Sequence, residues 1–233
     1  MSTALRQRVI VAGRQMSGGG PPIEVRFPFT GERVSWLSGV SAKVMDDAIA
    51  GSLAAFEEYR RAPAYRRASL LRAVSTTLDA GRDQLAREIT LETGKAIWES
   101  RLECERAVTT FRIAAEEATR IDGEIVPLDG IEAGAGRLGE LRRFPVGPVA
   151  AITPFNSPLN LVAHKVAPAL AAGNTVLVKP SPSTPLSALS IGRAVLDAAA
   201  DGDVPAGVIS VVPCADEVVE PLVTDPRVRA LSF

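Results

Sequence analysis

The sequence is poor in the residues that build metal centres and covalent cross-links. Among its 233 residues it has one histidine, His164, and two cysteines, Cys104 and Cys214. A single histidine excludes the histidine-based zinc sites that many hydrolases use. Two cysteines cannot form a framework of several disulfides. The sequence therefore predicts no metal site and no disulfide-stabilised fold.

The sequence also lacks the charge pattern of nucleic-acid binders and the long apolar runs of membrane proteins. Its 26 Lys and Arg residues are balanced by 27 Asp and Glu, without a basic patch, so we expect no nucleic-acid partner. No apolar run approaches the ~20 residues needed to cross a bilayer. Arginines near the N-terminus are followed by Gly18–Gly20 and two prolines, unlike a secretory signal. These absences predict a cytoplasmic protein with no membrane association.

What the chain does have is enough apolar residues for a full hydrophobic core, at 46% of the composition. Residues 1–122 are predicted to be mostly helical after an irregular start with short strands over 1–40. Ser41 suits a helix N-cap, Pro63 breaks the first helix, and Gly94 suits a helix end. The predicted helices span about 41–60, 65–80, 83–93 and 96–120.

After residue 145 the pattern changes to short apolar strands that alternate with helices. Thr184 and Pro185 suit a helix start, as an N-cap followed by proline at the first helical position. Such alternation is typical of a parallel, doubly wound sheet, so the predicted fold class is α/β. Ligands bind such sheets beyond the carboxyl ends of the strands, here at 153–158 and 179–184. The predicted strands are 149–153, 175–179, 208–212 and 228–233, and the predicted helices are 159–172, 184–200 and 217–224.

Residues 123–145 lie between these two regions and contain a glycine pattern. Gly134, Gly136 and Gly139 match the G-x-G-x-x-G spacing of dinucleotide-binding loops. That motif needs a strand before it and a helix after it, whereas here a loop precedes it and a predicted strand over 137–144 follows. We therefore interpret the pattern as a flexible turn and reject it as a cofactor site.

The two predicted ligand loops carry more specific patterns. The first reads Pro154-Phe155-Asn156 after a strand, and the second reads Lys179-Pro180-Ser181-Pro182 after the next strand. In isolation, Asn156 would be interpreted as a turn residue and Lys179 as a solvated strand end. Together with other blocks in the same order, the loops closely resemble those of the aldehyde dehydrogenase superfamily, over nearly all of the chain. The matching blocks outside the loops are Phe27–Glu32, Glu92–Lys95, Lys165–Asn174, Pro205–Pro213 and Asp225–Phe233.

The resemblance implies a role for each part of the chain. Asn156 is implied to stabilise an oxyanion with its side-chain amide, which donates a hydrogen bond without bringing charge. Lys179 is implied to bind the adenosine ribose of NAD or NADP. Residues 1–122 and 146–233 resemble the helical part and the truncated βαβ core of a cofactor-binding domain. Residues 123–145 resemble part of a β oligomerisation arm, which implies a homo-dimer or tetramer. The residues implied to line the cofactor cleft are Ile152, Thr153, Pro154, Phe155, Lys179, Pro180, Ser181 and Pro182.

Some positions depart from the family pattern around the cofactor. Pro182 stands where the family often has a glutamate that binds the ribose hydroxyls and repels a 2′-phosphate. Because Lys179 nearby attracts phosphate, the sequence predicts that NADP is tolerated. Phe155 replaces a common tryptophan, and Cys214 and Val219 stand where glycine is frequent.

The resemblance places the family's nucleophilic cysteine and general-base glutamate beyond Phe233, so we expect this chain to be a truncated product. Cys214 stands where the family has no catalytic cysteine, and Cys104 suits a packing residue within a helix. His164 has no acid or nucleophile at a recognisable spacing, and we interpret it as structural.

The implied function is NAD- or NADP-dependent oxidation of a small-molecule aldehyde to a carboxylic acid. The reaction would pass through a thiohemiacetal and a thioester on the downstream cysteine. Two alternatives stay open, namely a non-catalytic nucleotide-binding or oligomerising fragment and a relative that transfers the acyl group to CoA. Glu92 and Lys95 have no implied part in this chemistry and are expected to fix a helix terminus.

Overall fold

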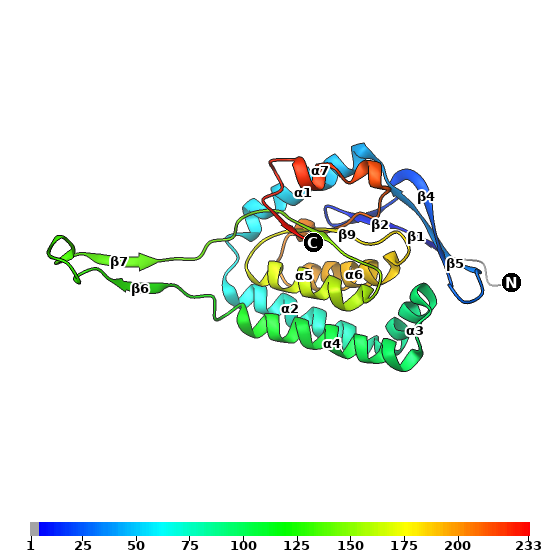
Figure 1. Ribbon diagram of the computed structural model, residues 1–233, viewed down its shortest axis with the longest axis horizontal. Helices are drawn as coiled ribbons and strands as arrows, with labels where there is room; N and C mark the ends of the chain where they lie inside the picture. The colour runs from blue at the N-terminus through cyan, green and yellow to red at the C-terminus, as the bar shows by residue number, and fades with distance from the viewer. Residues whose placement is uncertain (1–4) are drawn as a thin grey trace.

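The central sheet contains the strands that the sequence predicts. In the computed structural model, which describes residues 5–233, a six-stranded sheet has the order β11–β8–β9–β10–β2–β3 (Figure 1). The four strands β11, β8, β9 and β10 are parallel, and β2 pairs antiparallel with β10 and β3. The parallel, doubly wound fold is thus confirmed, and an antiparallel pair that was not predicted extends one edge. The strands are β2 (Val9–Val11), β3 (Arg14–Met16), β8 (Val149–Ile152), β9 (Val176–Lys179), β10 (Ile209–Val211) and β11 (Ala230–Ser232).

Helices cover both faces of this sheet (Figure 1). Successive residues of a strand point to opposite faces. Accordingly, Ala150 and Leu177 are buried in an apolar cluster with α1 and α7, whereas Ala151 and Val178 are buried in a second cluster with α2, α4, α5 and α6. Burial on both faces explains why these strands read as continuous apolar runs. The helices are α1 (Ala42–Tyr59), α2 (Ala64–Ala80), α4 (Ile97–Glu117), α5 (Pro158–Ala171), α6 (Pro185–Asp201) and α7 (Pro221–Thr224). No helix within residues 5–233 is both long enough and apolar enough to cross a membrane.

Local signals set several helix ends where the sequence predicts them. Ser41 Oγ accepts a hydrogen bond from Val44 N at 3.4 Å and caps the start of α1. Helix α2 begins directly after Pro63. Helix α3 (Arg82–Thr93) ends at Gly94, whose φ of 77° lies in the left-handed region that glycine adopts without strain. Gly94 thereby lets the chain turn sharply from α3 into α4.

The helix predicted over 217–224 is wrong as a single element. The chain forms a short 3-10 turn, η3 (Asp216–Val218), and then the separate helix α7. Pro221 occupies the first turn of α7. Because proline has no N–H and its ring collides with the carbonyl four residues back, Pro221 suits the first turn of a helix and disfavours a helix that continues through it from residue 217.

A second, three-stranded sheet is formed near the N-terminus, with the order β1–β5–β4. The turn between β4 and β5 contains Gly31, with a φ of 73°, and Phe27 N donates to Glu32 O at 2.9 Å. The prediction of short strands over 1–40 is confirmed from residue 5 onward, and residues 1–4 lie outside the described part. These strands are β1 (Leu5–Gln7), β4 (Gly19–Arg26) and β5 (Arg33–Val40).

A two-stranded antiparallel hairpin projects away from the rest of the molecule (Figure 1). The G-x-G-x-x-G pattern falls in its loop and second strand, with no helix directly after it, which confirms that the pattern is not a dinucleotide-binding turn. The second strand is shorter than the strand predicted over 137–144. The expected domain boundaries, at 122/123 and 145/146, stay a prediction. The hairpin consists of β6 (Glu124–Pro127), the 3-10 turn η1 (Glu132–Gly134) and β7 (Leu138–Leu141).

Replacing Gly94 by alanine is expected to lower the free energy of unfolding by about 1 kcal/mol, because a Cβ strains the left-handed conformation. The added Cβ would first meet Pro28 Cβ at 3.5 Å, an ordinary contact, so the cost lies in the backbone. Urea denaturation followed by circular dichroism measures the difference. Gly130→Ala is the matched control, since Gly130 has no positive φ and its added Cβ would meet nothing within 4 Å. Equal stability of Gly94→Ala and the wild type would contradict this account of the turn.

Candidate functional site

The two predicted ligand loops lie side by side at one edge of the central sheet. Strands β8 and β9 are adjacent and parallel, with Ile152 opposite Lys179 in the register, and Thr153 N donates to Lys179 O at 3.1 Å. Because both strands run in the same direction, the residues that follow them leave the sheet at the same edge. The structure therefore brings together the residues that the sequence analysis assigned to the site. These are Ile152, Thr153, Pro154, Phe155 and Asn156 in the first loop, and Lys179, Pro180, Ser181 and Pro182 in the second.

In the first loop, the aromatic ring of Phe155 and the amide of Asn156 are exposed, and the residue directly after the strand is buried. Thr153 is buried, whereas Pro154, Phe155 and Asn156 are exposed, Phe155 by 64%. The exposed amide of Asn156 can donate hydrogen bonds to a molecule bound over this edge. Helix α5 begins two residues later, at Pro158. The position of Asn156 therefore depends on how the start of α5 is held.

A buried carboxylate from α4 holds the start of α5. Ser157, at the N-cap position, makes no capping hydrogen bond with its side chain. Instead, Glu103 Oε1 accepts hydrogen bonds from Leu159 N at 2.9 Å and from Asn160 N at 3.2 Å. Its second oxygen, Oε2, pairs with Lys95 Nζ at 2.6 Å. The carboxylate satisfies amides that a helix start leaves free, and its charge is favourable at the positive end of the helix dipole.

The second loop begins at a lysine whose side chain is nearly buried. The side chain of Lys179 is 10% exposed, and its Nζ lies 3.7 Å from Oδ1 of the exposed Asp216. Ser181 Oγ and Ser183 Oγ are 2.9 Å apart, and Pro182 is exposed at the loop surface. A charged group in a buried position needs oxygen partners to offset its lost hydration. This loop therefore suits a ligand that is rich in oxygen atoms.

Glu92, near the end of α3, holds the start of α6 as Glu103 holds the start of α5. Its Oε2 accepts from Leu186 N at 2.8 Å, and its Oε1 accepts from Ser187 N at 3.1 Å and from Ser187 Oγ. Burial raises the pKa of Glu92 to about 8, against the lowering effect of these hydrogen bonds. The prediction that Glu92 fixes a helix terminus is confirmed. Thr184 occupies the predicted N-cap position of α6, but its buried hydroxyl has no hydrogen-bond partner among the described residues, and Glu92 binds the free amides instead.

Glu103 was not predicted from the sequence, although the sequence contains a signal for it. Glu103 lies on the stripe of α4 that faces the protein interior. A carboxylate in an apolar stripe has to find polar partners inside the protein. Lys95, which was expected to fix a helix terminus, does so indirectly, because it pairs with Glu103, which holds the start of α5. The other buried residues of that stripe include Ser100, Cys104, Ala107, Phe111 and Ala114.

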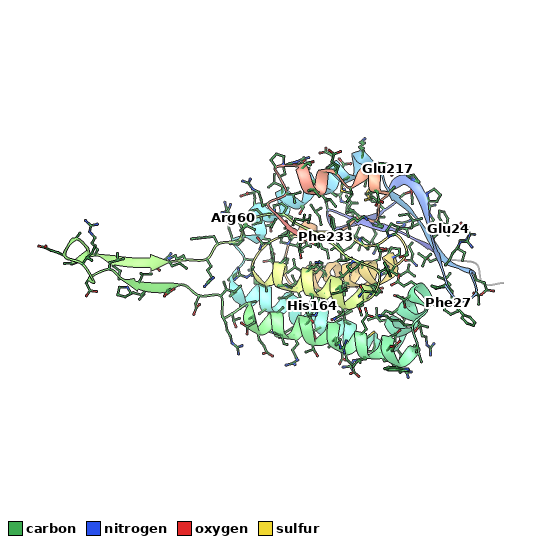
Figure 2. All side chains as sticks on the ribbon, viewed as in Figure 1. Glu24, Phe27, Arg60, His164, Glu217 and Phe233 are labelled. Atoms are coloured by element: carbon green, nitrogen blue, oxygen red, sulfur yellow. The ribbon has the colours of Figure 1, made fainter. Side chains whose placement is uncertain are left out.

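The remaining candidate groups lie outside the two loops. Cys104 and Cys214 are fully buried, and burial raises the pKa of their thiols to about 12 and about 11. Neither has the exposure or the low pKa of a reactive thiol. His164 lies on α5 toward α4, where it lines a mostly apolar groove of about 340 Å³ with Ile113 and Pro168 (Figure 2). Within residues 5–233, no three His, Cys, Asp or Glu side chains are grouped to hold a metal ion.

Known proteins share this arrangement. The sequence model of the aldehyde dehydrogenase family matches residues 15–233. The mitochondrial succinate-semialdehyde dehydrogenase of Arabidopsis thaliana is 38% identical to the chain over 234 residues, which cover 100% of this chain and 43% of that protein. The chain thus spans just under half the length of this curated relative.

Two solved structures superimpose closely on the chain. Aldehyde dehydrogenase 21 from Physcomitrella patens, in complex with the reaction product succinate, gives a TM-score of 0.95 at 35% identity, with 99% of this chain and 47% of that chain covered. The NADP-dependent glyceraldehyde-3-phosphate dehydrogenase from Bacillus halodurans C-125, complexed with NADP, gives a TM-score of 0.92 at 31% identity, with 98% and 48% covered. With sequence, sheet and helices all in agreement, the chain belongs to the aldehyde dehydrogenase family.

Proposed function

We propose that this chain forms the cofactor-binding part of an NAD- or NADP-dependent aldehyde dehydrogenase. The observation that carries the proposal is the placement of the Asn156 loop beside Lys179, at the carboxyl ends of β8 and β9. A doubly wound sheet binds its ligand at that edge. The complex of the Bacillus halodurans relative with NADP supports a dinucleotide as the ligand.

The second loop fits the ribose of such a dinucleotide. The ion-pair partner of Lys179, Asp216, is 3.7 Å away, which is longer than a hydrogen bond. The N–H donors of Lys179 can therefore bind ribose oxygens. Thr184 Oγ1, in the same loop, is buried and has no hydrogen-bond partner among the described residues. Both observations fit a sugar that is rich in hydroxyl groups.

Two residues near Lys179 act in opposite directions on the choice between NAD and NADP. Pro182 offers no carboxylate to repel a 2′-phosphate, and the Lys179 ammonium attracts one, which supports tolerance of NADP. Asp216 is an exposed carboxylate beside Lys179 and disfavours a second anion there. Both dinucleotides are therefore proposed to bind, with Asp216 setting part of their ratio.

Asn156 is proposed to stabilise the oxyanion formed from the aldehyde substrate. Its Nδ2 would donate to the carbonyl oxygen that becomes negative when a cysteine thiolate attacks and forms a thiohemiacetal. The dinucleotide, when bound, supplies the hydride acceptor for oxidation to the thioester. A water activated by a glutamate would then release the carboxylic acid. We assign the cysteine and this glutamate to parts of the whole protein outside the present chain.

Two other functions differ from this one in the chemistry that follows nucleotide binding. A CoA-acylating relative would use the same two loops and differ in the group that accepts the acyl chain. A non-catalytic fragment would bind nucleotide or form oligomers without turnover. Aldehyde oxidation is preferred because the Arabidopsis relative is a semialdehyde dehydrogenase and the Physcomitrella structure holds its reaction product.

The hairpin of β6 and β7 is proposed to be an oligomerisation arm. Large apolar side chains on it are exposed, Leu138 by 80% and Ile125 by 73%. An isolated two-stranded hairpin is marginally stable in water, and clustered apolar exposure marks an interaction surface. The proposed partner is a second copy of the protein, in a homo-dimer or tetramer.

Lys179→Ala is expected to raise the Kd for both NAD and NADP about tenfold, or ~1.4 kcal/mol, because the ribose loses its cationic donor. Titration calorimetry with each dinucleotide measures the change. Arg87→Ala, which removes an exposed cation from α3, is the control and should bind as the wild type does. Binding that is unaffected by Lys179→Ala would contradict the assigned role. A folded wild-type chain that binds neither dinucleotide would contradict the proposed function.

Asp216→Asn is expected to raise the affinity for NADP relative to NAD about fivefold at low ionic strength, because it removes repulsion of the 2′-phosphate. The ratio of the two dissociation constants measures this effect. The matched control is Glu217→Gln, a change at the neighbouring exposed acid that is labelled in Figure 2. An equal shift in both variants would indicate a general charge effect and remove Asp216 from the account of selectivity.

Both thiols of the folded chain are expected to resist modification at pH 8. With a pKa of about 11 for Cys214 and about 12 for Cys104, about one thiol in a thousand or fewer is ionised at that pH. A chromogenic disulfide reagent measures the rate, and the chain unfolded in concentrated guanidinium chloride provides the fast reference. If Cys214 reacted as fast in the folded chain as in the unfolded chain, its exclusion as a nucleophile would be wrong.

A further inference from the structure

We propose that Glu92 and Glu103 are positioning residues of the cofactor site. Each fixes one of the two site loops through the first turn of the helix that follows that loop. The inference rests on the proposed function, because it makes the placement of Lys179 and Asn156 depend on these two acids.

The starts of α5 and α6 are held by side chains from other helices and not by their own N-cap residues. Glu103 reaches amides 56 and 57 positions later in the chain, and Glu92 reaches amides 94 and 95 positions later. Ser157 and Thr184 are residue types that commonly cap helices, but neither makes a side-chain capping bond here. The starts of α5 and α6 are therefore positioned relative to α3 and α4.

Both acids belong to the same pair of consecutive helices, α3 and α4. Glu92 lies in the last turn of α3, Glu103 lies in the second turn of α4, and Gly94 turns the chain between them. A hydrogen bond of 2.9 Å between Thr90 Oγ1 and Ser100 Oγ joins the two helices. The starts of α5 and α6, where the Asn156 loop and the Lys179 loop end, are thus both held by the same pair of helices.

The contacts of the two carboxylates differ in a way that an experiment can use. Both acids are buried, Glu92 at 2% and Glu103 at 4% exposure. Glu103 places one oxygen on both amides of α5 and the other on Lys95. Glu92 uses both oxygens on α6. Glutamine in place of Glu103 can therefore keep both amide contacts, whereas glutamine in place of Glu92 loses one.

The test combines amide hydrogen exchange with calorimetric binding of ADP, which contains the ribose assigned to Lys179. Glu92→Leu is expected to speed exchange in the first turn of α6 about tenfold and to raise the Kd for ADP about fivefold. Glu103→Leu is expected to speed exchange in the first turn of α5 instead, with a much smaller effect on ADP. If the two acids only stabilised the fold, the exchange rates and the Kd for ADP would change together in both leucine variants.

Conservative variants and matched controls make the comparison sharper. Glu103→Gln should restore exchange at the start of α5 to near the wild-type rate, whereas Glu92→Gln should restore the start of α6 only in part. If a leucine variant does not fold, this difference between the glutamine variants carries the test. Glu88→Gln alters an acid of α3 that accepts a hydrogen bond from Ser190 Oγ of α6 at 2.7 Å, and Glu99→Gln alters an exposed acid of α4. Neither control should change exchange at the helix starts or the affinity for ADP.

Two results would overturn the proposal. One is equal acceleration of exchange at both helix starts in each leucine variant, in step with the loss of overall stability. The other is an unchanged Kd for ADP in Glu92→Leu. If the wild-type chain binds neither ADP nor NAD, the proposed function fails, and the exchange rates still decide whether the two acids position the loops.

Discussion

A helix start leaves backbone N–H groups without partners, and in this chain two buried glutamate side chains supply the partners for α5 and α6. A buried polar group left unpaired costs about 1–3 kcal/mol, so these contacts bind the helices firmly to the α3–α4 unit. The same contacts fix where the polypeptide enters each helix, directly after the site loops. Core packing and site geometry are therefore held by the same pair of side chains, Glu92 and Glu103.

The sheet explains why the site can only lie at an edge. Its inner strands, β8, β9, β10 and β2, are three or four residues long and are largely buried between two apolar clusters, so neither face can receive a polar ligand there. The entry into β8 is fixed from the side by Asn174 Oδ1, which accepts from Val146 N at 2.8 Å and from Gly147 N at 3.1 Å. With these faces covered, the carboxyl ends of β8 and β9 are the place where the polar side chains of the candidate site can reach a ligand.

Features that act over a few residues made most of the fold predictable from sequence. Gly94 and Pro63 end or separate helices through their own backbone constraints, so the structure has these breaks where the sequence predicts them. Thr184 was assigned as a cap because its residue type suits that position, but a distant acid, Glu92, occupies the amides. Glu103 was missed for the same reason, since its partners lie far along the chain and only the folded structure brings them together. The site loops could be predicted because their motifs are contiguous, whereas the groups that hold them are not.

Helix N-termini are also the positions where α/β proteins commonly bind phosphate groups. In this chain the first free amides of α5 and α6 already donate to the protein's own carboxylates. The pyrophosphate of a dinucleotide bound as proposed would therefore have to be neutralised by donors elsewhere in the protein. Because the first amides of α5 are already occupied, the turn between β8 and α5 needs no run of glycines to admit a phosphate. It is free to carry Pro154, Phe155 and Asn156 instead.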